Sequence, residues 1–158
     1  YLQDFFRPFY VADRVGLKSK PFRMVKLRSM IVDADKSGVD STSSIDSRIT
    51  AVGKIVRKYK LDEFTQLFNV LKGDMSLVGP RPCLESQHEL IEARNKLNVF
   101  SVRPGITGLA QVNDIDMSTP ELLAETDAKM IASFSVKHYF YLIFLTLTGK
   151  GAGDRIRK

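Results

Sequence analysis

Two adjacent carboxylates, Asp62 and Glu63, are the residues of this chain whose type and spacing best suit chemistry. A cationic run at 57–60 (Arg-Lys-Tyr-Lys) precedes them, and Arg81 follows between the two prolines of Gly79-Pro80-Arg81-Pro82. Carboxylates bind divalent cations such as Mg²⁺, and guanidinium and ammonium groups neutralise phosphate oxygens. The set therefore suits the handling of a phosphoanhydride through a metal ion.

An amphipathic helix at 62–72 is expected to carry the carboxylates. Its apolar residues recur with the i, i+3, i+4, i+7 spacing of one helical face, namely Phe64, Leu67, Phe68 and Leu71. Gly73 predicts the helix end, which places Asp62 at the N-cap and Glu63 in the first turn. For an Asp-Glu pair taken alone, capping the helix is the commoner role. The surrounding cations favour chemistry instead.

The remaining pattern predicts an α+β fold, a mostly helical compact domain with a small β-hairpin element and interfacial amphipathic helices. We expect a hairpin within 9–32 with Pro21 near its turn, and a polar loop at 33–47. Further helices are expected at 50–59 and 84–97, and a Gly/Pro turn at 102–113 leads into a short strand. Ser118 and Glu121 resemble a capping box that opens a helix reaching about residue 134. Strands and helices do not alternate regularly, so a doubly wound sheet is not expected.

Length and charge limit the classes of protein that fit. The 158 residues predict one domain, 1–158, and the 24 Lys and Arg against 18 Asp and Glu give a net charge of +6. A basic domain suits nucleic acid, an anionic membrane surface or phosphorylated substrates. No nucleic-acid-binding motif accompanies the charge, so no nucleic acid partner is expected. Cys83 is the only cysteine, which excludes an internal disulfide.

Apolar residues gather near both ends of the chain. The segment 139–147 is apolar on almost every face and has basic residues on both sides, while the opening residues 1–10 are rich in Phe and Tyr. Neither segment reaches the roughly twenty apolar residues that a membrane-spanning helix needs. The segment 139–147 is therefore either a core helix or an interfacial one, and its aromatics beside basic residues favour the interface.

Three blocks in order give this chain a resemblance to the bacterial sugar transferases. The blocks are Lys26-Leu27-Arg28-Ser29-Met30, the long run 48–82 and the run 102–112 (Val-Arg-Pro-Gly-Ile-Thr-Gly-Leu-Ala-Gln-Val). These enzymes are monotopic phosphoglycosyl transferases that start O-antigen, capsule and exopolysaccharide synthesis. The resemblance implies a location at the cytoplasmic face of the bacterial inner membrane. It also implies a re-entrant membrane helix ahead of Tyr1, and it is compatible with an oligomer.

The resemblance further implies a reaction and a set of site residues. A sugar 1-phosphate would pass from a nucleotide-sugar donor, usually a UDP-sugar, to a membrane polyprenyl phosphate acceptor. Asp62 would attack the phosphoryl group, and Glu63 would bind Mg²⁺ or assist the incoming phosphate, with Asp62 as a second metal ligand. The implied substrate-binding residues are Lys26, Arg28, Arg57, Arg81 and Asp127.

Two departures from the family pattern concern positions near these residues. Phe64-Thr65 replaces the commoner Leu-Pro after the carboxylate pair, and Asp127 is followed three residues later by Met130 where Tyr is usual. The second departure weakens the substrate-binding role of Asp127. The alternative from another class is a non-catalytic membrane-surface scaffold, in which Asp62 and Glu63 only cap a helix. Convergence of Asp62, Glu63, Arg81 and Lys26 on one site would distinguish the two hypotheses.

Overall fold

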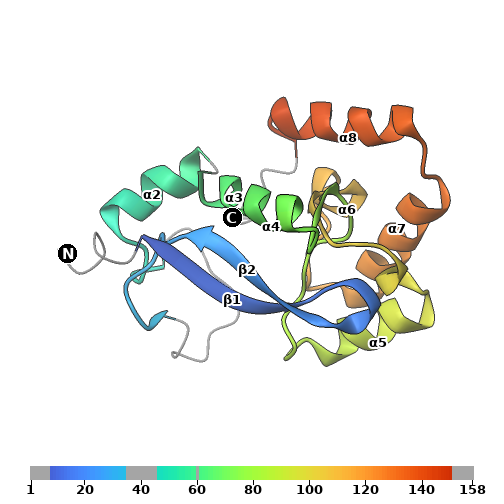
Figure 1. The fold of residues 1–158 in the computed structure, drawn as a ribbon, viewed down its shortest axis with the longest axis horizontal. Helices are drawn as coiled ribbons and strands as arrows, with labels where there is room; N and C mark the ends of the chain where they lie inside the picture. The colour runs from blue at the N-terminus through green and yellow to red at the C-terminus, as the bar shows by residue number, and fades with distance from the viewer. Residues whose placement is uncertain (1–7, 35–45, 60, 151–158) are drawn as a thin grey trace.

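Two small sheets lie among short helices in the computed structural model, which describes residues 8–34, 46–59 and 61–150 (Figure 1). The strands are β1 (Phe9–Val15), β2 (Pro21–Leu27), β3 (Ser76–Val78) and β4 (Gly105–Thr107). The α-helices are α2 (Ala51–Lys58), α3 (Leu61–Phe64), α4 (Gln66–Lys72), α5 (His88–Lys96), α6 (Leu109–Val112), α7 (Pro120–Ala132) and α8 (Val136–Leu147). Two 3-10 turns are η1 (Leu17–Ser19) and η3 (Val99–Ser101). The α+β prediction is confirmed.

The predicted hairpin is present as β1 and β2. The strands pair antiparallel from Phe9 opposite Leu27 to Val15 opposite Pro21, with η1 in the connection. Along β1, Tyr10, Ala12 and Arg14 are half-buried or buried while the residues between them are exposed, the pattern of a strand with one covered face. The hairpin lies between α3–α4 on one side and α5 on the other (Figure 1).

The predicted helix 62–72 is interrupted once and begins one residue early. It consists of α3 and α4, separated at Thr65, and Gly73 ends it in the left-handed conformation with φ 88° as expected. Because α3 begins at Leu61, Asp62 lies in the first turn and the N-cap prediction is wrong. The apolar spacing located the helical face but not the cap, since Leu61 extends the helix by one residue before the stripe begins.

The capping box predicted at Ser118 does not form. Thr119 precedes α7 without a side-chain capping bond, and the Ser118 hydroxyl donates to the Asp116 carboxylate instead. Pro120 begins the helix, where its missing N–H costs nothing. The helix ends at Ala132, close to the expected residue 134.

The parallel pair of β3 and β4 was not predicted beyond a short strand near 102–113. Ser76 pairs with Gly105 and Val78 pairs with Thr107. The two backbones approach so closely that a Cβ on Gly105 would lie 2.0 Å from the Gly79 nitrogen. Three-residue strands are too short for alternation to mark them, and the close approach depends on glycines far apart in the sequence.

Two apolar clusters form the core. The larger one lies where β1, the segment after β3, α5, η3, α6 and α7 meet, and it contains Val15, Cys83, Leu90, Phe100, Ala110 and Leu123. The second joins α6, α7 and α8 through Val112, Met130 and Leu142. Cys83 is fully buried in the first cluster, where it packs as a small apolar residue.

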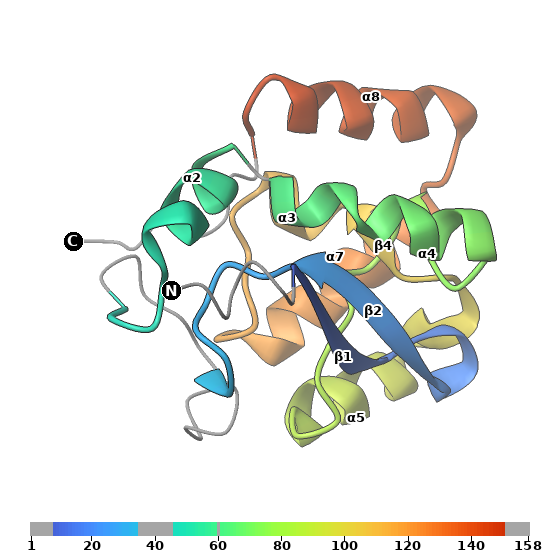
Figure 2. The same cartoon turned by 60° about the vertical axis from the view of Figure 1, so that its left-hand side comes forward.

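Two helical segments present apolar side chains outward. The predicted stripe on α3–α4 is exposed: Phe64 and Phe68 are each 64 % exposed and Leu71 is 84 % exposed. Helix α8 packs against α6, β3 and β4 and lies above α3–α4 in the view of Figure 2. It exposes Val136, Phe140, Tyr141, Phe144 and Leu147. In the described part of the chain, none of the helices combines the length and apolar character needed to cross a membrane. The aromatic residues before Pro8 lie outside the described residues.

Candidate active site

Lys26 and Arg14 lie on the same face of the hairpin. Residues directly opposite each other in an antiparallel pair share a face, and Tyr10 is opposite Lys26 while Arg14 is opposite Phe22. Because side chains alternate along each strand, all four point to one side of the sheet. Lys26 and Arg14 are both half-buried there, on the side of the hairpin that packs against the rest of the fold.

Helices α3 and α4 are fixed to the outer edge of β2 beside Lys26. The Thr65 hydroxyl donates to the Val25 carbonyl at 3.0 Å, and the Asn69 amide oxygen accepts the Val25 N–H at 3.0 Å. Asn69 Nδ2 also donates to the Arg23 carbonyl at 2.7 Å. These bonds cover the free edge of β2 and place the first turn of α3, with Asp62 and Glu63, next to Lys26.

Arg81 lies in a turn whose backbone is fixed from several directions. The Gly105 N–H donates to the Pro80 carbonyl at 2.9 Å, and the Val15 N–H donates to the Cys83 carbonyl at 3.0 Å. The Arg81 carbonyl accepts a hydrogen bond from Arg94 Nη1 at 2.8 Å. The turn thus contacts β1, the start of β4 and α5.

The other charged groups of the site shift the pKa of Lys26. Burial, with contributions from the Arg81 and Arg14 charges, lowers the pKa of Lys26 from 10.5 to about 8. Glu63 and Asp62 act in the opposite direction and favour the ammonium form. Burial also lowers the pKa of Arg14, which the neighbouring Arg81 charge lowers further. Asp62, Glu63, Arg81 and Lys26 therefore converge on one site, together with Arg14.

The two carboxylates have free oxygen lone pairs. Both side chains are half-buried, and neither forms a hydrogen bond or ion pair within the described residues. Across 8–34, 46–59 and 61–150, no group of three or more Asp, Glu, His or Cys side chains is arranged to hold a metal ion. Mg²⁺ is usually held by one or two carboxylates together with waters and substrate phosphates. The Asp62–Glu63 donor set fits that requirement.

A family model described as bacterial sugar transferase matches residues 2–150 of the chain. The chain belongs to this family. The sequence resemblance, based on the three blocks, is thereby confirmed.

Curated relatives in this family act on undecaprenyl phosphate according to their names. A UDP-N-acetylgalactosamine-undecaprenyl-phosphate N-acetylgalactosaminephosphotransferase of Aeromonas hydrophila is 38% identical over 152 residues, covering 90% of this chain and 36% of the relative. Two proteins named UDP-glucose:undecaprenyl-phosphate glucose-1-phosphate transferase are similar as well. The one from Caulobacter vibrioides is 44% identical over 104 residues, covering 65% of the chain and 39% of the relative. The one from Klebsiella pneumoniae is 39% identical over 141 residues, covering 85% and 30%. The chain spans only about a third of the length of these relatives.

Arg28 and Arg57, both expected to bind substrate, lie at the far end of the hairpin face. The Arg28 guanidinium is 5.8 Å from the centre of the Tyr10 ring and donates to the Phe9 carbonyl at 3.1 Å. Arg57 Nε donates to the Ser29 hydroxyl at 2.9 Å. Arg28 is thus held against β1, and Arg57 joins α2 to the segment that follows β2. Both are half-buried, and their roles toward a substrate stay predictions.

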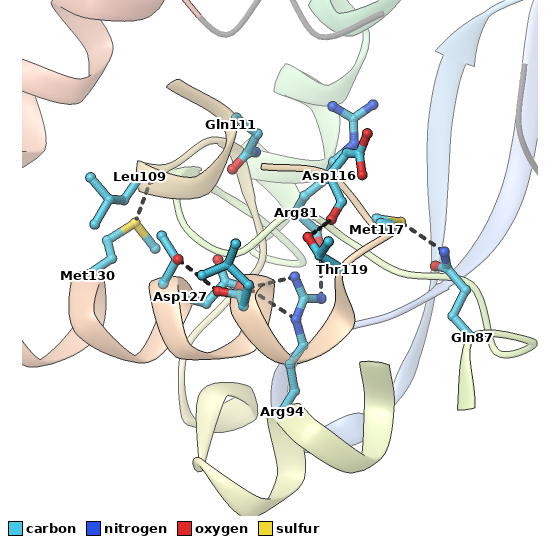
Figure 3. Close-up of polar contacts among 12 residues, drawn as sticks. Arg81, Gln87, Arg94, Leu109, Gln111, Asp116, Met117, Thr119, Asp127 and Met130 are labelled. Carbon is cyan, nitrogen blue, oxygen red and sulfur yellow. Dashed lines mark hydrogen bonds and ion pairs between the residues drawn. The ribbon is translucent and has the colours of Figure 1, made fainter. Parts of the chain in front are cut away.

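Asp127 is placed differently from the sequence expectation. Its side chain is 0% exposed and accepts hydrogen bonds from Arg94 Nε at 3.1 Å and Nη2 at 2.7 Å (Figure 3). Burial raises the pKa of Asp127, and the Arg94 charge opposes that rise. A carboxylate without solvent access cannot touch a substrate in this conformation. Its connection to the site runs through Arg94 to the Arg81 turn.

Sequence reasoning missed four residues that shape the site: Arg14, Thr65, Asn69 and Arg94. The alternation Tyr10, Ala12, Arg14 along a predicted strand could have placed Arg14 on the face of Lys26. Thr65 and Asn69 lie beside the apolar stripe of their helix, at positions that face β2, and their spacing of four marks one polar face. Nothing in the local sequence distinguishes Arg94 from a surface residue.

Proposed function

We propose that this chain is the catalytic part of an enzyme that transfers a sugar 1-phosphate from a nucleotide-diphosphate sugar to polyprenyl phosphate. The observation that carries the proposal is the convergence of Asp62 and Glu63 with Lys26, Arg81 and Arg14. The names of the relatives support undecaprenyl phosphate as the acceptor and a UDP-sugar as the donor.

In the first step, a carboxylate oxygen of Asp62 attacks the phosphorus that carries the sugar. A new P–O bond forms to Asp62, the bond to the bridging oxygen of the diphosphate breaks, and nucleoside monophosphate leaves with that oxygen and the electron pair. In the second step, a phosphate oxygen of the polyprenyl phosphate attacks the same phosphorus and releases the Asp62 carboxylate. The product is a polyprenyl diphosphate sugar. Covalent catalysis of this kind divides one difficult displacement into two easier ones.

The cations of the site suit the charge that this reaction handles. Phosphoryl transfer depends mainly on positioning and on neutralising the phosphate oxygens. Arg81 offers a planar fork of donors for phosphate, and Lys26 and Arg14 add charge from the hairpin face. A Mg²⁺ ion held by Glu63 and Asp62 would supply further charge neutralisation when bound. The Asp62 carboxylate must approach an anionic donor. The neighbouring Lys26 ammonium partly balances the Asp62 charge and so reduces the repulsion between them.

We also propose that the chain works at the cytoplasmic face of the bacterial inner membrane. A polyprenyl phosphate keeps its hydrocarbon tail in the bilayer, so the site must open toward the membrane surface. The exposed apolar residues of α3–α4 directly follow Asp62 and Glu63, and α8 adds a second apolar face. Burial of such faces in the headgroup region would bring the carboxylates to the acceptor phosphate.

The rival proposal, a non-catalytic membrane-surface scaffold, is less well supported. A scaffold needs the exposed apolar faces and the basic charge. It has no use for three half-buried cations around two carboxylates that find no hydrogen-bond partner in the part of the chain that the structure describes. Burying a lysine far enough to lower its pKa to about 8 costs stability. Such a cost is common at functional sites and uncommon on surfaces that only dock.

A release assay tests the proposal. The full-length protein, in membranes or detergent, is incubated with undecaprenyl phosphate and a panel of UDP-sugars, and UMP is measured. We expect acceptor-dependent UMP release with at least one donor, loss of release in a chelator and its recovery with Mg²⁺. The absence of release across the panel would contradict the proposed reaction, and full activity in the chelator would contradict the metal.

A further inference from the structure

The Arg94 side chain joins two elements far apart in the sequence. It leaves α5, is 1% exposed, and contacts Asp127 on α7 through Nε and Nη2. Its third nitrogen, Nη1, donates to the Arg81 carbonyl at 2.8 Å. Figure 3 shows Arg94 between α5 and α7, with the Arg81 guanidinium extending away from it. One buried guanidinium therefore connects the core to the backbone of a candidate phosphate-binding residue.

The Arg81 carbonyl is held differently from its neighbours. The carbonyls of Pro80 and Cys83 accept hydrogen bonds from backbone N–H groups, whereas that of Arg81 accepts one from a side chain. Pro80 and Pro82 have no N–H, so this turn has few donors of its own with which to fix its backbone. The orientation of the peptide between Arg81 and Pro82 consequently depends on Arg94.

Asp127 makes this arrangement rigid and leaves its own charge poorly compensated. Asp127 Oδ2 accepts both hydrogen bonds from Arg94, while Oδ1 has no partner within the described residues. A buried ion pair is weak evidence for stability, because an apolar pair of similar volume is often as stable or more so. Burying the pair costs desolvation energy but fixes the Arg94 guanidinium in one orientation. A fixed guanidinium suits a role in orienting Arg81.

We propose that Arg94 and Asp127 are positioning residues that aim the Arg81 guanidinium at the transferred phosphate. Asp127 fixes the plane of the Arg94 guanidinium, Arg94 fixes the Arg81 carbonyl, and the backbone of the turn then directs the Arg81 side chain toward Lys26, Asp62 and Glu63. This inference rests on the proposed function, because it assigns Arg81 to the phosphate. It explains how a residue with no access to substrate can affect the reaction.

Two variants separate positioning from stability. Arg94→Lys retains a positive charge for Asp127, but its single ammonium group cannot reproduce the planar fork that reaches both Asp127 and the Arg81 carbonyl. The double variant Arg94→Met with Asp127→Leu removes both charges and leaves the site apolar. Leu123→Ala is the matched control, because Leu123 lies on α7 and is fully buried in the core without contacting Arg81 through a hydrogen bond.

The first measurement needs no activity. Amide hydrogen exchange is followed in the parent protein and in each variant. The informative amides are those of Val15 and Gly105, which donate to the Cys83 and Pro80 carbonyls of the turn, and they are compared with the amides of α5 and α7. We expect Arg94→Lys and the apolar double variant to speed exchange at Val15 and Gly105 while α5 and α7 stay protected. Leu123→Ala should speed exchange in α7 first. Unchanged exchange at Val15 and Gly105 in both Arg94 variants would overturn the inference.

The second measurement is a double-mutant cycle on kcat/KM for UMP release. Each variant is made alone and with Arg81→Ala. We expect Arg94→Lys to lower kcat/KM by about tenfold to a hundredfold in the parent and by less than about threefold when Arg81 is already alanine, because the effect passes through Arg81. Leu123→Ala should have the same effect in both backgrounds.

The outcomes distinguish this inference from the proposed function. If Arg94→Lys lowers kcat/KM equally in the parent and in the Arg81→Ala background, the positioning role is overturned even though the enzyme is active. An inactive parent would contradict the proposed function, and the exchange measurement would still decide whether Arg94 holds the Arg81 turn. Full activity of the stable apolar double variant would also overturn the inference.

Discussion

Asn69 on α4 binds the backbone of Val25 on β2: its side-chain oxygen accepts the Val25 N–H at 3.0 Å. Val25 directly precedes Lys26, and its carbonyl accepts the Thr65 hydroxyl at 3.0 Å. Both backbone polar groups of Val25 are therefore satisfied by side chains of one helical segment. The relationship matters because it links the strand that carries Lys26 to the helix that carries the two carboxylates.

Asn69→Ala should destabilise the protein and impair the site. The substitution removes the acceptor for Val25 and the donor for Arg23 and leaves partly buried backbone groups without partners, so we expect a loss of about 2 to 4 kcal/mol in the free energy of unfolding. Chemical denaturation measures this loss. Asn95→Ala is the control, since exposed Asn95 only accepts the Ser19 hydroxyl, and its effect should stay within about 0.5 kcal/mol. Equal effects of the two variants would contradict the docking role of Asn69.

The activity should fall as Lys26 loses its proton. With its pKa lowered to about 8, Lys26 is an ammonium at neutral pH and becomes neutral as the pH rises through 8. We expect kcat/KM for the nucleotide sugar to decline above about pH 8, because this parameter reports ionisations of the free enzyme. Lys26→Arg should remove the decline, since arginine keeps its charge. A parent profile that stays flat to pH 10 would contradict the assignment.

The same ionisation predicts how stability depends on pH. The pKa of Lys26 is about 8 in the folded protein and 10.5 when unperturbed, so between these values the unfolded chain binds more protons. Stability from this group therefore rises with pH through that window, and its penalty is fully present below pH 8. Lys26→Met should stabilise the protein at pH 7 by more than at pH 10. A stabilisation that does not change between the two pH values would contradict the burial of a charged Lys26.

Two glycine substitutions should differ sharply. A Cβ at position 105 would lie 2.0 Å from the Gly79 nitrogen, a backbone atom that cannot move without separating β3 from β4. Gly105→Ala should therefore cost about 3 kcal/mol or more. Gly73→Ala meets open space and is strained only by its φ of 88°, so about 1 kcal/mol is expected. Thermal unfolding compares the two, and similar costs would contradict the close packing behind the Arg81 turn.

The apolar face of α3–α4 should bind membranes. Replacing Phe64 and Phe68 together by serine removes large exposed side chains without opening the core, since each is 64% exposed. We expect the full-length protein to sediment with vesicles at high salt and the double variant to bind less, because apolar burial resists screening by ions. His88→Ala, at an exposed position at the start of α5, serves as the control. Undiminished binding of the serine variant would contradict this role.

The elements that leave a pattern in their own local sequence could be predicted. Pro21 near a turn within 9–32 indicated the hairpin, the stripe of Phe64, Leu67, Phe68 and Leu71 indicated the helix, and Gly73 indicated its end. The periodicity of that stripe could not say which way it faces, because an apolar face packs equally well against a core or a lipid surface. The stripe is exposed, and the polar Thr65 and Asn69 make the contact with β2.

The site could be predicted only where a resemblance or a local motif marked it. Asp62, Glu63, Arg81 and Lys26 belong to matched blocks, and the structure brings them together. Arg94 and Asp127 are separated by 33 positions and form a pair that only the packing of α5 on α7 creates. No local pattern specifies such a pair, so the resemblance alone assigns Asp127 to substrate binding and does not reveal its burial. The parallel contact of β3 with β4 was missed for the same reason.

The most direct test of the central claim uses Asp62→Asn. Asn is nearly the same size as Asp, and the side chain makes no hydrogen bond within the described residues, so the free energy of unfolding should change by at most about 1 kcal/mol through the helix dipole. Donor labelled in the phosphate attached to the sugar is mixed with each protein, and UMP release and covalent label on the protein are measured. We predict a sugar-phosphate adduct at Asp62 of the parent, no adduct on the variant, and a rate loss of at least about a thousandfold, or about 4 kcal/mol. Turnover of the Asn variant within a few-fold of the parent, or an adduct on another residue, would contradict nucleophilic catalysis by Asp62.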